Sequence, residues 1–412
     1  MKLEEFPGDS SSSPADICVG LCPTNLFRNF QTTGSDYAVA TMTDALNELL
    51  RATSRSFYLT LRVLPARVRP QIGLAYLLAR TTDTIADTEI LPVNDRLDAL
   101  QKLRERILGQ SSAPLHFDGL AQKQNLSAEK LLLEKVENSL AALQNFHATD
   151  QKLIHEVLTT ITSGQELDLK RFAGSAAVPA ASVGVPPTEK DVEVETTSTA
   201  RETRALPKKI IALQTEAELD DYTYRVAGCV GGFWTKICRA HLFPNAKIDD
   251  VQFITDGIRF GKGLQLVNIL RDLPKDLRNG RCYLPLERLT KAGLKPEDLL
   301  KPENEPRLRP LYNHYLDLAE SHLAAGWNYA NLIPRGQFRV RLACAWPVLI
   351  GAKTLSRLRE GDVLNPQRRI KITRGEVRGI LLRSIASCPF PGAWRKLFST
   401  DRKAVAPGAD LA

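Results

Sequence analysis

Apolar residues recur every three or four positions through most of the chain, the spacing that places them on one face of an α-helix. The pattern begins near Thr43, and convincing alternation of apolar and polar residues, typical of a β-strand, is absent. Clear helical stretches are residues 45–64, 70–87, 96–108, 129–146, 151–169, 219–238 and 249–273. The sequence therefore predicts an all-α fold.

Two stretches break this pattern. Residues 1–38 are rich in Ser, Thr, Asp, Gly and Pro, and residues 173–209 contain four prolines and almost no aromatic residues. Both are predicted to be disordered. Long unstructured loops are unusual inside compact domains, which favours a linker between two domains at 173–209. A long insertion within one domain is the alternative.

Several features indicate a cytoplasmic protein. The longest uninterrupted apolar stretch, Leu342–Ala352, is shorter than the roughly 20 residues of a membrane-spanning helix and contains a proline. The first residues are acidic and polar, whereas a signal peptide begins with positive charge and an apolar run. The chain has seven cysteines and no C-x-x-C pair, which fits reduced thiols.

Positive charge is concentrated near the C-terminus. The chain carries 55 Lys and Arg against 47 Asp and Glu, a net charge of +8, and the surplus lies after Lys353. An anionic partner is one explanation, and a solvated basic surface is the other. Few aromatics and no recognition motif accompany the charge, so we predict no nucleic-acid binding. Phe390, Trp394 and Phe398 among basic residues suit peripheral contact with a membrane, and an irregular tail is the alternative.

Two polar stripes interrupt the apolar helices. The residues of the first stripe are spaced i, i+4, i+7 and i+11, and those of the second i, i+3, i+7 and i+11, so each set shares a helix face. The first consists of Tyr76, Arg80, Asp83 and Asp87, and the second of Gln265, Asn268, Asp272 and Asp276. Each stripe therefore ends in the motif D-x-x-x-D.

Two carboxylates one turn apart repel each other unless a cation lies between them, and hard oxygen ligands suit Mg²⁺. A Mg²⁺ held by few carboxylates keeps places for phosphate oxygens, which Arg55, Arg80 and Arg271 could further neutralise. Either motif alone is more typical of an exposed helix; the pair, flanked by apolar residues, favours a diphosphate site. Pro274 should kink or end the second helix, which would take Asp276 off its stripe.

Four segments carry a resemblance to a known family. Residues 54–65, 76–87, 222–234 and 264–285 resemble, in order, the signature segments of the squalene/phytoene synthases, the head-to-head prenyl synthases. The resemblance implies one all-α domain over residues 39–384, an isoprenoid-synthase-type helical bundle around a central apolar cavity. Residues 173–209 are then an insertion within this domain, which reverses the preference for two domains. Residues 385–412 are predicted to form a C-terminal tail.

The resemblance also implies roles for individual residues. Mg²⁺ would be bound by Asp83, Asp87, Asn268, Asp272 and Asp276. The substrate diphosphates would be bound by Ser54, Arg55 and Phe57, supported by Tyr76, Arg80, Asn268 and Arg271. Tyr222 is a candidate for proton handling in the first half-reaction, and a core tyrosine is an equal alternative.

Three further positions stay open at this stage. Gly228 and Gly232 could mark close approach to a substrate chain, although helix packing is the preferred explanation. The segment 163–169, "SGQELDL", is similar to the family's G-M-x-x-D-L, but Gln165 stands where the family has Met.

The implied reaction joins two prenyl diphosphates through a cyclopropylcarbinyl diphosphate. Squalene synthases then quench the cation with hydride from NADPH, whereas phytoene synthases lose a proton. Residues 83–87, "DTIAD", look more like the squalene synthase motif, whereas residues 280–285, "GRCYLP", are similar to the phytoene type. We interpret the chain as a squalene synthase that uses farnesyl diphosphate, Mg²⁺ and NADPH. The alternatives are a phytoene or dehydrosqualene synthase, an enzyme that stops at the cyclopropyl diphosphate, and a non-catalytic partner subunit.

Overall fold

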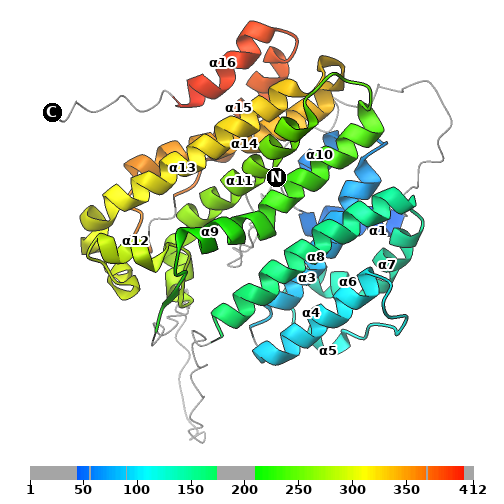
Figure 1. Ribbon diagram of the computed structural model, residues 1–412, viewed down its shortest axis with the longest axis horizontal. Coiled ribbons are helices and arrows are strands. Elements are labelled where there is room, and N and C mark those ends of the chain that lie inside the picture. Colours follow the sequence, from blue (N-terminus) through cyan, green and yellow to red (C-terminus); the bar gives the residue numbers. More distant parts are fainter. Residues whose placement is uncertain (1–43, 55–56, 90, 174–208, 368–369, 403–412) are drawn as a thin grey trace, which may run out of the picture.

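The computed structural model describes residues 44–54, 57–89, 91–173, 209–367 and 370–402 (Figure 1). The predicted disordered tail, residues 1–38, lies outside these ranges, as does nearly all of the predicted insertion at 173–209. Arg55 also falls outside them, and so does the side chain of Phe57.

The described residues are 77% helical with almost no strands, which confirms the predicted fold class. The α-helices are α1 (Asp44–Ser54), α2 (Phe57–Val63), α3 (Arg69–Asp87), α4 (Val93–Ile107), α5 (Asp118–Ala121), α6 (Ser127–Glu134), α7 (Val136–Gln144), α8 (Ala148–Arg171), α9 (Glu216–Thr223), α10 (Cys229–Leu242), α11 (Asp250–Arg278), α12 (Leu286–Lys291), α13 (Glu305–Leu332), α14 (Phe338–Glu360), α15 (Arg374–Ser387) and α16 (Pro391–Arg402). A π-helix, η1 (Tyr224–Gly228), joins α9 to α10, and the 3₁₀ turns are η2 (Pro296–Leu300), η3 (Pro302–Asn304) and η4 (Arg335–Gln337). Two short parallel strands, β1 (Ile211–Ala212) and β2 (Arg281–Cys282), pair with Ile211 opposite Arg281.

Helix α11 occupies the middle of the bundle and packs against α10, α13 and α14. Figure 1 shows the helices from α3 to α7 gathered beside α8, with α13 to α16 on the other side of α10 and α11. Helix α8 contacts α3 and α4 as well as α10. Buried residues before and after the undescribed residues 174–208, such as Leu158 and Ile237, belong to one hydrophobic core.

Helices α10 and α11 touch through their backbones at Gly231. A methyl group added to Gly231 would lie 1.8 Å from the carbonyl oxygen of Gly257, whereas one on Gly232 would lie 3.6 Å from the Ile258 side chain. The close approach extends to Gly228, because a methyl group added to Gly261 would lie 2.9 Å from Cα of Gly228. Of the two glycines that the sequence singled out, Gly228 therefore takes part in it and Gly232 does not. Two helix axes can come this close only where a side chain is missing.

Pro274 does not end α11, which continues to Arg278, so the predicted helix end is wrong. A proline leaves the carbonyl four residues earlier without its helical donor. Here that carbonyl belongs to Leu270, and the hydroxyl of the fully buried Tyr312 on α13 donates to it at 2.9 Å. The hydrogen bond from α13 replaces the missing one, so the helix continues and Asp276 stays on the polar stripe.

We predict that Tyr312→Phe lowers the free energy of unfolding by about 1–3 kcal/mol, because it leaves the Leu270 carbonyl buried without a donor. The same substitution in a Pro274→Ala background should cost less, since the introduced alanine restores the backbone N–H. Chemical denaturation of the two single variants and the double variant measures this coupling. Additive effects of the two substitutions would contradict the explanation.

The C-terminal segment is helical through Arg402. Trp394 and Phe398 on α16, two of the three aromatic residues on which the membrane-contact prediction rested, are buried and stack on Trp327, with ring centroids 5.3 and 5.9 Å from it. Only the third, Phe390, is strongly exposed, at 64%. The structure thus differs from a tail beginning at residue 385, because α16 packs against α14 and α15, and its aromatic rings stack on Trp327 near the end of α13.

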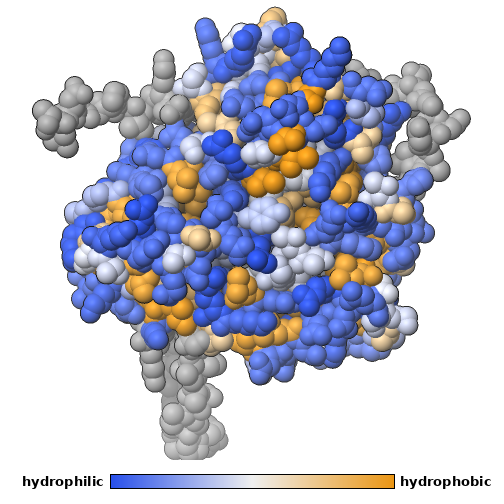
Figure 2. Space-filling model, viewed as in Figure 1, coloured by the Kyte–Doolittle hydropathy of each residue, from blue (hydrophilic) through white to orange (hydrophobic). Residues whose placement is uncertain are grey.

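The surface shown in Figure 2 is mostly polar, with hydrophobic side chains in small separate groups. Among the helices that the structure describes, none combines the length and the apolar character needed to cross a membrane.

Candidate active site

Helix α3 carries the first stripe, and its two aspartates occupy different environments. Asp83 is half-buried and accepts a hydrogen bond from Nε2 of Gln165 on α8, at 2.5 Å. Burial raises the pKa of Asp83 to about 7, although the positive charge of Arg80 opposes the shift. Asp87, at the end of the helix, is more exposed to solvent, yet the protein around it still raises its pKa.

Helix α11 carries the second stripe. Asn268 is buried, and its Nδ2 lies 3.4 Å from Oε1 of Gln265. Arg271 donates from Nε and Nη2 to the two carboxylate oxygens of Asp272, at 3.0 and 2.5 Å. Burial and the neighbouring charge of Asp272 raise the pKa of Asp276 to about 8. In this structure Arg271 therefore binds a motif aspartate and not a free anion.

Arg281 brings the two stripes together. It follows α11 after a turn in which Gly280 adopts a φ of 76°, a value that favours glycine. Its positive charge opposes the rise in pKa of both Asp87 on α3 and Asp276 on α11. Its guanidinium also lies 3.9 Å from Asp168 and 4.0 Å from Glu89. The far ends of the two D-x-x-x-D motifs thus both lie within the electrostatic reach of one cation.

A chain of three side chains lies beside Arg281. The ring of Tyr222 stacks on that of Tyr283 with centroids 4.6 Å apart, and Oη of Tyr283 donates to Oδ2 of Asp168 at 2.9 Å. Burial raises the pKa of both tyrosines well above the usual value, and the nearby Tyr283 side chain opposes the shift at Tyr222. Burial also raises the pKa of Asp168, to about 6. Tyr222 is therefore a neutral hydroxyl connected through Tyr283 to a carboxylate.

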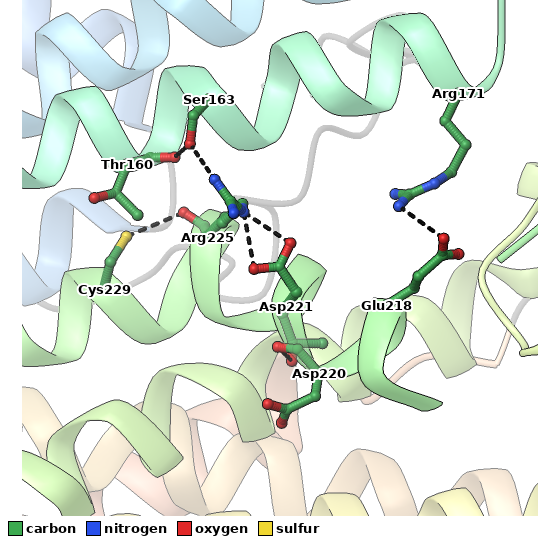
Figure 3. Close-up of polar contacts among 9 residues, drawn as sticks. Thr160, Ser163, Arg171, Glu218, Asp220, Asp221, Arg225 and Cys229 are labelled. Atoms are coloured by element: carbon green, nitrogen blue, oxygen red, sulfur yellow. Dashed lines mark hydrogen bonds and ion pairs between the residues drawn. The ribbon is translucent and has the colours of Figure 1, made fainter. Parts of the chain in front are cut away.

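The π-helix η1 fixes the segment that carries Tyr222, and Figure 3 shows its polar contacts. Arg225 donates from Nε to both oxygens of Asp221, at 2.9 and 2.8 Å, and from Nη1 to Oγ of Ser163 on α8, at 2.8 Å. A methyl group on Gly164 would lie only 2.8 Å from Cβ of Arg225. Helix α8 is therefore held tightly against η1. Single-turn π-helices occur frequently at functional sites.

The remaining predicted residues contact their own surroundings. The Ser54 hydroxyl donates to the Leu50 carbonyl within its own helix. Oη of Tyr76 lies 3.4 Å from the Thr53 carbonyl, which places the end of α1 beside the first stripe. Arg80 pairs with Glu129 on α6, at 2.6 Å. The structure thus brings Tyr76, Arg80, Asp83 and Asp87 together, and it leaves Ser54 occupied within α1.

Sequence reasoning missed several residues of this site. Arg281 and Tyr283 lie in "GRCYLP", and Gln165 and Asp168 in "SGQELDL", segments that the sequence singled out without giving these side chains a role. Their distance along the chain from the stripes hid the contacts. No local signal distinguishes Glu129 from other helical glutamates.

The donor set suits a hard divalent cation. In the part of the chain that is described, no three Asp, Glu, His or Cys side chains are already grouped as a metal site. The four motif aspartates instead form two carboxylate pairs, one on α3 and one on α11. Mg²⁺ commonly uses one or two carboxylates and completes its shell with water and phosphate oxygens, so this all-oxygen set fits it.

Comparison with known proteins identifies the family. Residues 50–376 match the squalene/phytoene synthase family model, and the chain belongs to this family of head-to-head prenyl synthases, which are prenyltransferase-type enzymes. It is 26% identical over 372 residues to the squalene synthase of Saccharomyces cerevisiae, covering 90% of this chain and 72% of the relative. It is 27% identical over 336 residues to the presqualene diphosphate synthase of Zymomonas mobilis, covering 81% and 89%.

Solved structures show the same fold. The complex of TcSQS with the ligand BPH1237 has a TM-score of 0.66 at 20% identity and covers 90% of this chain and 94% of that one. A dehydrosqualene synthase in complex with a ligand has a TM-score of 0.53 at 20% identity, covering 83% and 95%.

We predict that the Mg²⁺-free protein loses stability as the pH rises from about 4 to about 8. In the unfolded chain the aspartates titrate near their ordinary pKa of 3.8, whereas folding raises the pKa of Asp168, Asp83 and Asp276 to about 6, 7 and 8. Between these values the folded state holds more protons than the unfolded state, so the free energy of unfolding falls with increasing pH.

Asp276→Asn should flatten this dependence and stabilise the Mg²⁺-free protein at pH 8, by on the order of 1 kcal/mol or more. Thermal and chemical denaturation between pH 5 and pH 8 measure both effects, and Asp98→Asn, on the exposed face of α4, is the control. A stability that increases with pH in the Mg²⁺-free protein would contradict the burial of these carboxylates.

Proposed function

We propose that the chain is a squalene synthase, which condenses two molecules of farnesyl diphosphate head to head and reduces the product with NADPH. The observation that supports this proposal best is the convergence of the two D-x-x-x-D motifs on Arg281, with the chain Tyr222–Tyr283–Asp168 beside them. One part of this arrangement suits the departure of a diphosphate, and the other suits the transfer of a proton.

The first step is ionisation of an allylic diphosphate. Asp83, Asp87, Asp272 and Asp276 would hold Mg²⁺, which supplies positive charge to the leaving group when bound. Arg281 adds a fixed cation between the motifs, and such preorganised charge stabilises an anion without reorganisation during the reaction. The apolar core around the stripes excludes water from the allylic cation, which water would otherwise quench.

The second step joins the two prenyl chains and releases a proton. Oη of Tyr222 is suited to receive that proton while its own proton passes to Tyr283 and the proton of Tyr283 passes to Asp168. The raised pKa of both tyrosines keeps them neutral at pH 7, so no phenolate has to be maintained. The released proton ends on Asp168, the acidic end of the chain.

A second candidate function is release of the cyclopropyl diphosphate itself. The match with the presqualene diphosphate synthase of Zymomonas mobilis spans 89% of that protein. Reduction with NADPH rests on the resemblance of "DTIAD" to the squalene synthase motif alone. Phytoene or dehydrosqualene formation is the third outcome to test, because family members with these printed names also match.

The proposal predicts squalene from farnesyl diphosphate, Mg²⁺ and NADPH, and no squalene when any one of the three is omitted. Purified protein would be incubated with farnesyl or geranylgeranyl diphosphate, with and without NADPH, and the products identified by mass spectrometry. Cyclopropyl diphosphate that persists with NADPH would favour the second function. Phytoene or dehydrosqualene without NADPH would favour the third, and no turnover by folded protein would contradict all three.

We further predict that Tyr222→Phe lowers kcat by roughly 100-fold, the scale of a lost proton acceptor. Binding of a non-ionisable farnesyl diphosphate analogue should change little, because the ring stacking on Tyr283 is retained. Tyr329→Phe is the matched control, since Tyr329 is also buried but its hydroxyl bonds to Thr235, outside the site. Equal losses of activity in the two variants would indicate a packing role for Tyr222.

A further inference from the structure

Gln165 holds the first aspartate of the α3 motif. Its Nε2 donates to Oδ1 of Asp83 at 2.5 Å, and its side chain is only 8% exposed. Its other polar atom, Oε1, is buried and has no hydrogen-bond partner among the described residues. A methionine at this position, as in the family's G-M-x-x-D-L segment, could not donate such a bond. Gln165 therefore gives this chain an interaction that its sequence pattern did not predict.

The backbone of α8 is fixed at this point. The preceding residues make the contacts to η1 described above: Ser163 accepts from Arg225, and Gly164 permits the close approach. Because these neighbours fix the helix, the Gln165 amide is presented to Asp83 with little freedom to move away. The Gln165–Asp83 hydrogen bond is therefore a preorganised contact between α8 and α3.

Arg80 and Asp83 would otherwise be partners. They lie three residues apart on α3, a spacing at which opposite charges on a helix attract each other. In the described structure, however, Arg80 pairs with Glu129 on α6 at 2.6 Å, and Asp83 is bonded to Gln165 on α8. Each of the two side chains thus has its direct partner on a neighbouring helix, although the charge of Arg80 still acts on Asp83.

We propose that Gln165, together with Glu129, is a positioning residue of the first aspartate motif. Gln165 orients the Asp83 carboxylate, and Glu129 takes the direct ion pair with Arg80, so the carboxylate oxygens of Asp83 stay available for a divalent cation. The inference rests on the proposed function, in which this motif binds Mg²⁺ and diphosphate. Residues that orient a metal ligand from behind typically contribute about 10–100-fold to metal affinity.

The chain offers a matched control for this proposal. Gln71 on α3 donates from Nε2 to Oδ2 of Asp150 on α8 at 3.1 Å, and both residues are buried. This second Gln–Asp bond joins the same two helices outside the candidate site. Gln71→Met and Gln165→Met therefore each remove one buried amide–carboxylate bond between α3 and α8.

The experiment measures Mg²⁺ binding to the full chain by calorimetry in the presence of inorganic pyrophosphate. We expect Gln165→Met to raise the Kd for Mg²⁺ about 10-fold or more, and Gln71→Met to leave it within about 2-fold, while both lower the melting temperature. In turnover assays, the Mg²⁺ concentration for half-maximal rate should rise in Gln165→Met, with kcat largely recovered at saturating Mg²⁺. A merely structural role would not produce this separation.

A second variant keeps the proposal testable if Gln165→Met does not fold. Glu129→Gln keeps the shape of a half-buried side chain while releasing Arg80, and it should also weaken Mg²⁺ binding. If the wild-type protein binds Mg²⁺ with pyrophosphate and the Kd is unchanged in Gln165→Met or in Glu129→Gln, the positioning role is wrong but the proposed function stands. Equal weakening of Mg²⁺ binding in Gln165→Met and Gln71→Met would contradict the positioning role in the same way. Wild-type protein that binds no Mg²⁺ under these conditions would overturn the proposed function as well.

Discussion

The arrangement of the candidate site depends on one constraint: several carboxylates lie close together inside an apolar helical bundle. Asp83, Asp168 and Asp276 are carboxylates surrounded by protein, and the cost of removing their charge from water appears as a raised pKa at each. A cation or hydrogen-bond donors can compensate such a group without neutralising it by a proton. Arg281 provides part of that compensation. The negative charge that Arg281 does not balance favours the binding of a further cation.

Helix α8 organises the elements around this charge. It contacts α3 and α4 on one side and α10 and η1 on the other. Within six residues it supplies Ser163 to Arg225, Gln165 to Asp83 and Asp168 to Tyr283. One rigid helix therefore sets the distance between the aspartate motif on α3 and the tyrosine at the end of α9. Such preorganisation of charged groups is what an ionising reaction requires.

The sequence predicted the parts of the site that depend on local periodicity. The stripes on α3 and α11 follow from a repeat of 3.6 residues, and that repeat survives at Asp276 even though Pro274 argues against it. The hydrogen bond that keeps the helix intact at Pro274 comes from Tyr312, which is distant in the sequence, so no local rule could predict it. Arg281 and Gln165 were hidden for the same reason, since their partners lie on other helices. Trp394 and Phe398 show the converse: their aromatic character was evident, but whether they face solvent or the core depends on Trp327.

The short pairing of β1 with β2 couples distant parts of the chain. The N–H of Ile211 donates to the Gly280 carbonyl at 2.9 Å, and the N–H of Leu213 to the Cys282 carbonyl at 3.0 Å. These two bonds bracket Arg281, so the cation shared by both motifs is anchored to the backbone that enters the bundle just before α9. A displacement of β1 would therefore also move Arg281. The position of Arg281 in the bundle therefore depends on the path of the chain that precedes α9.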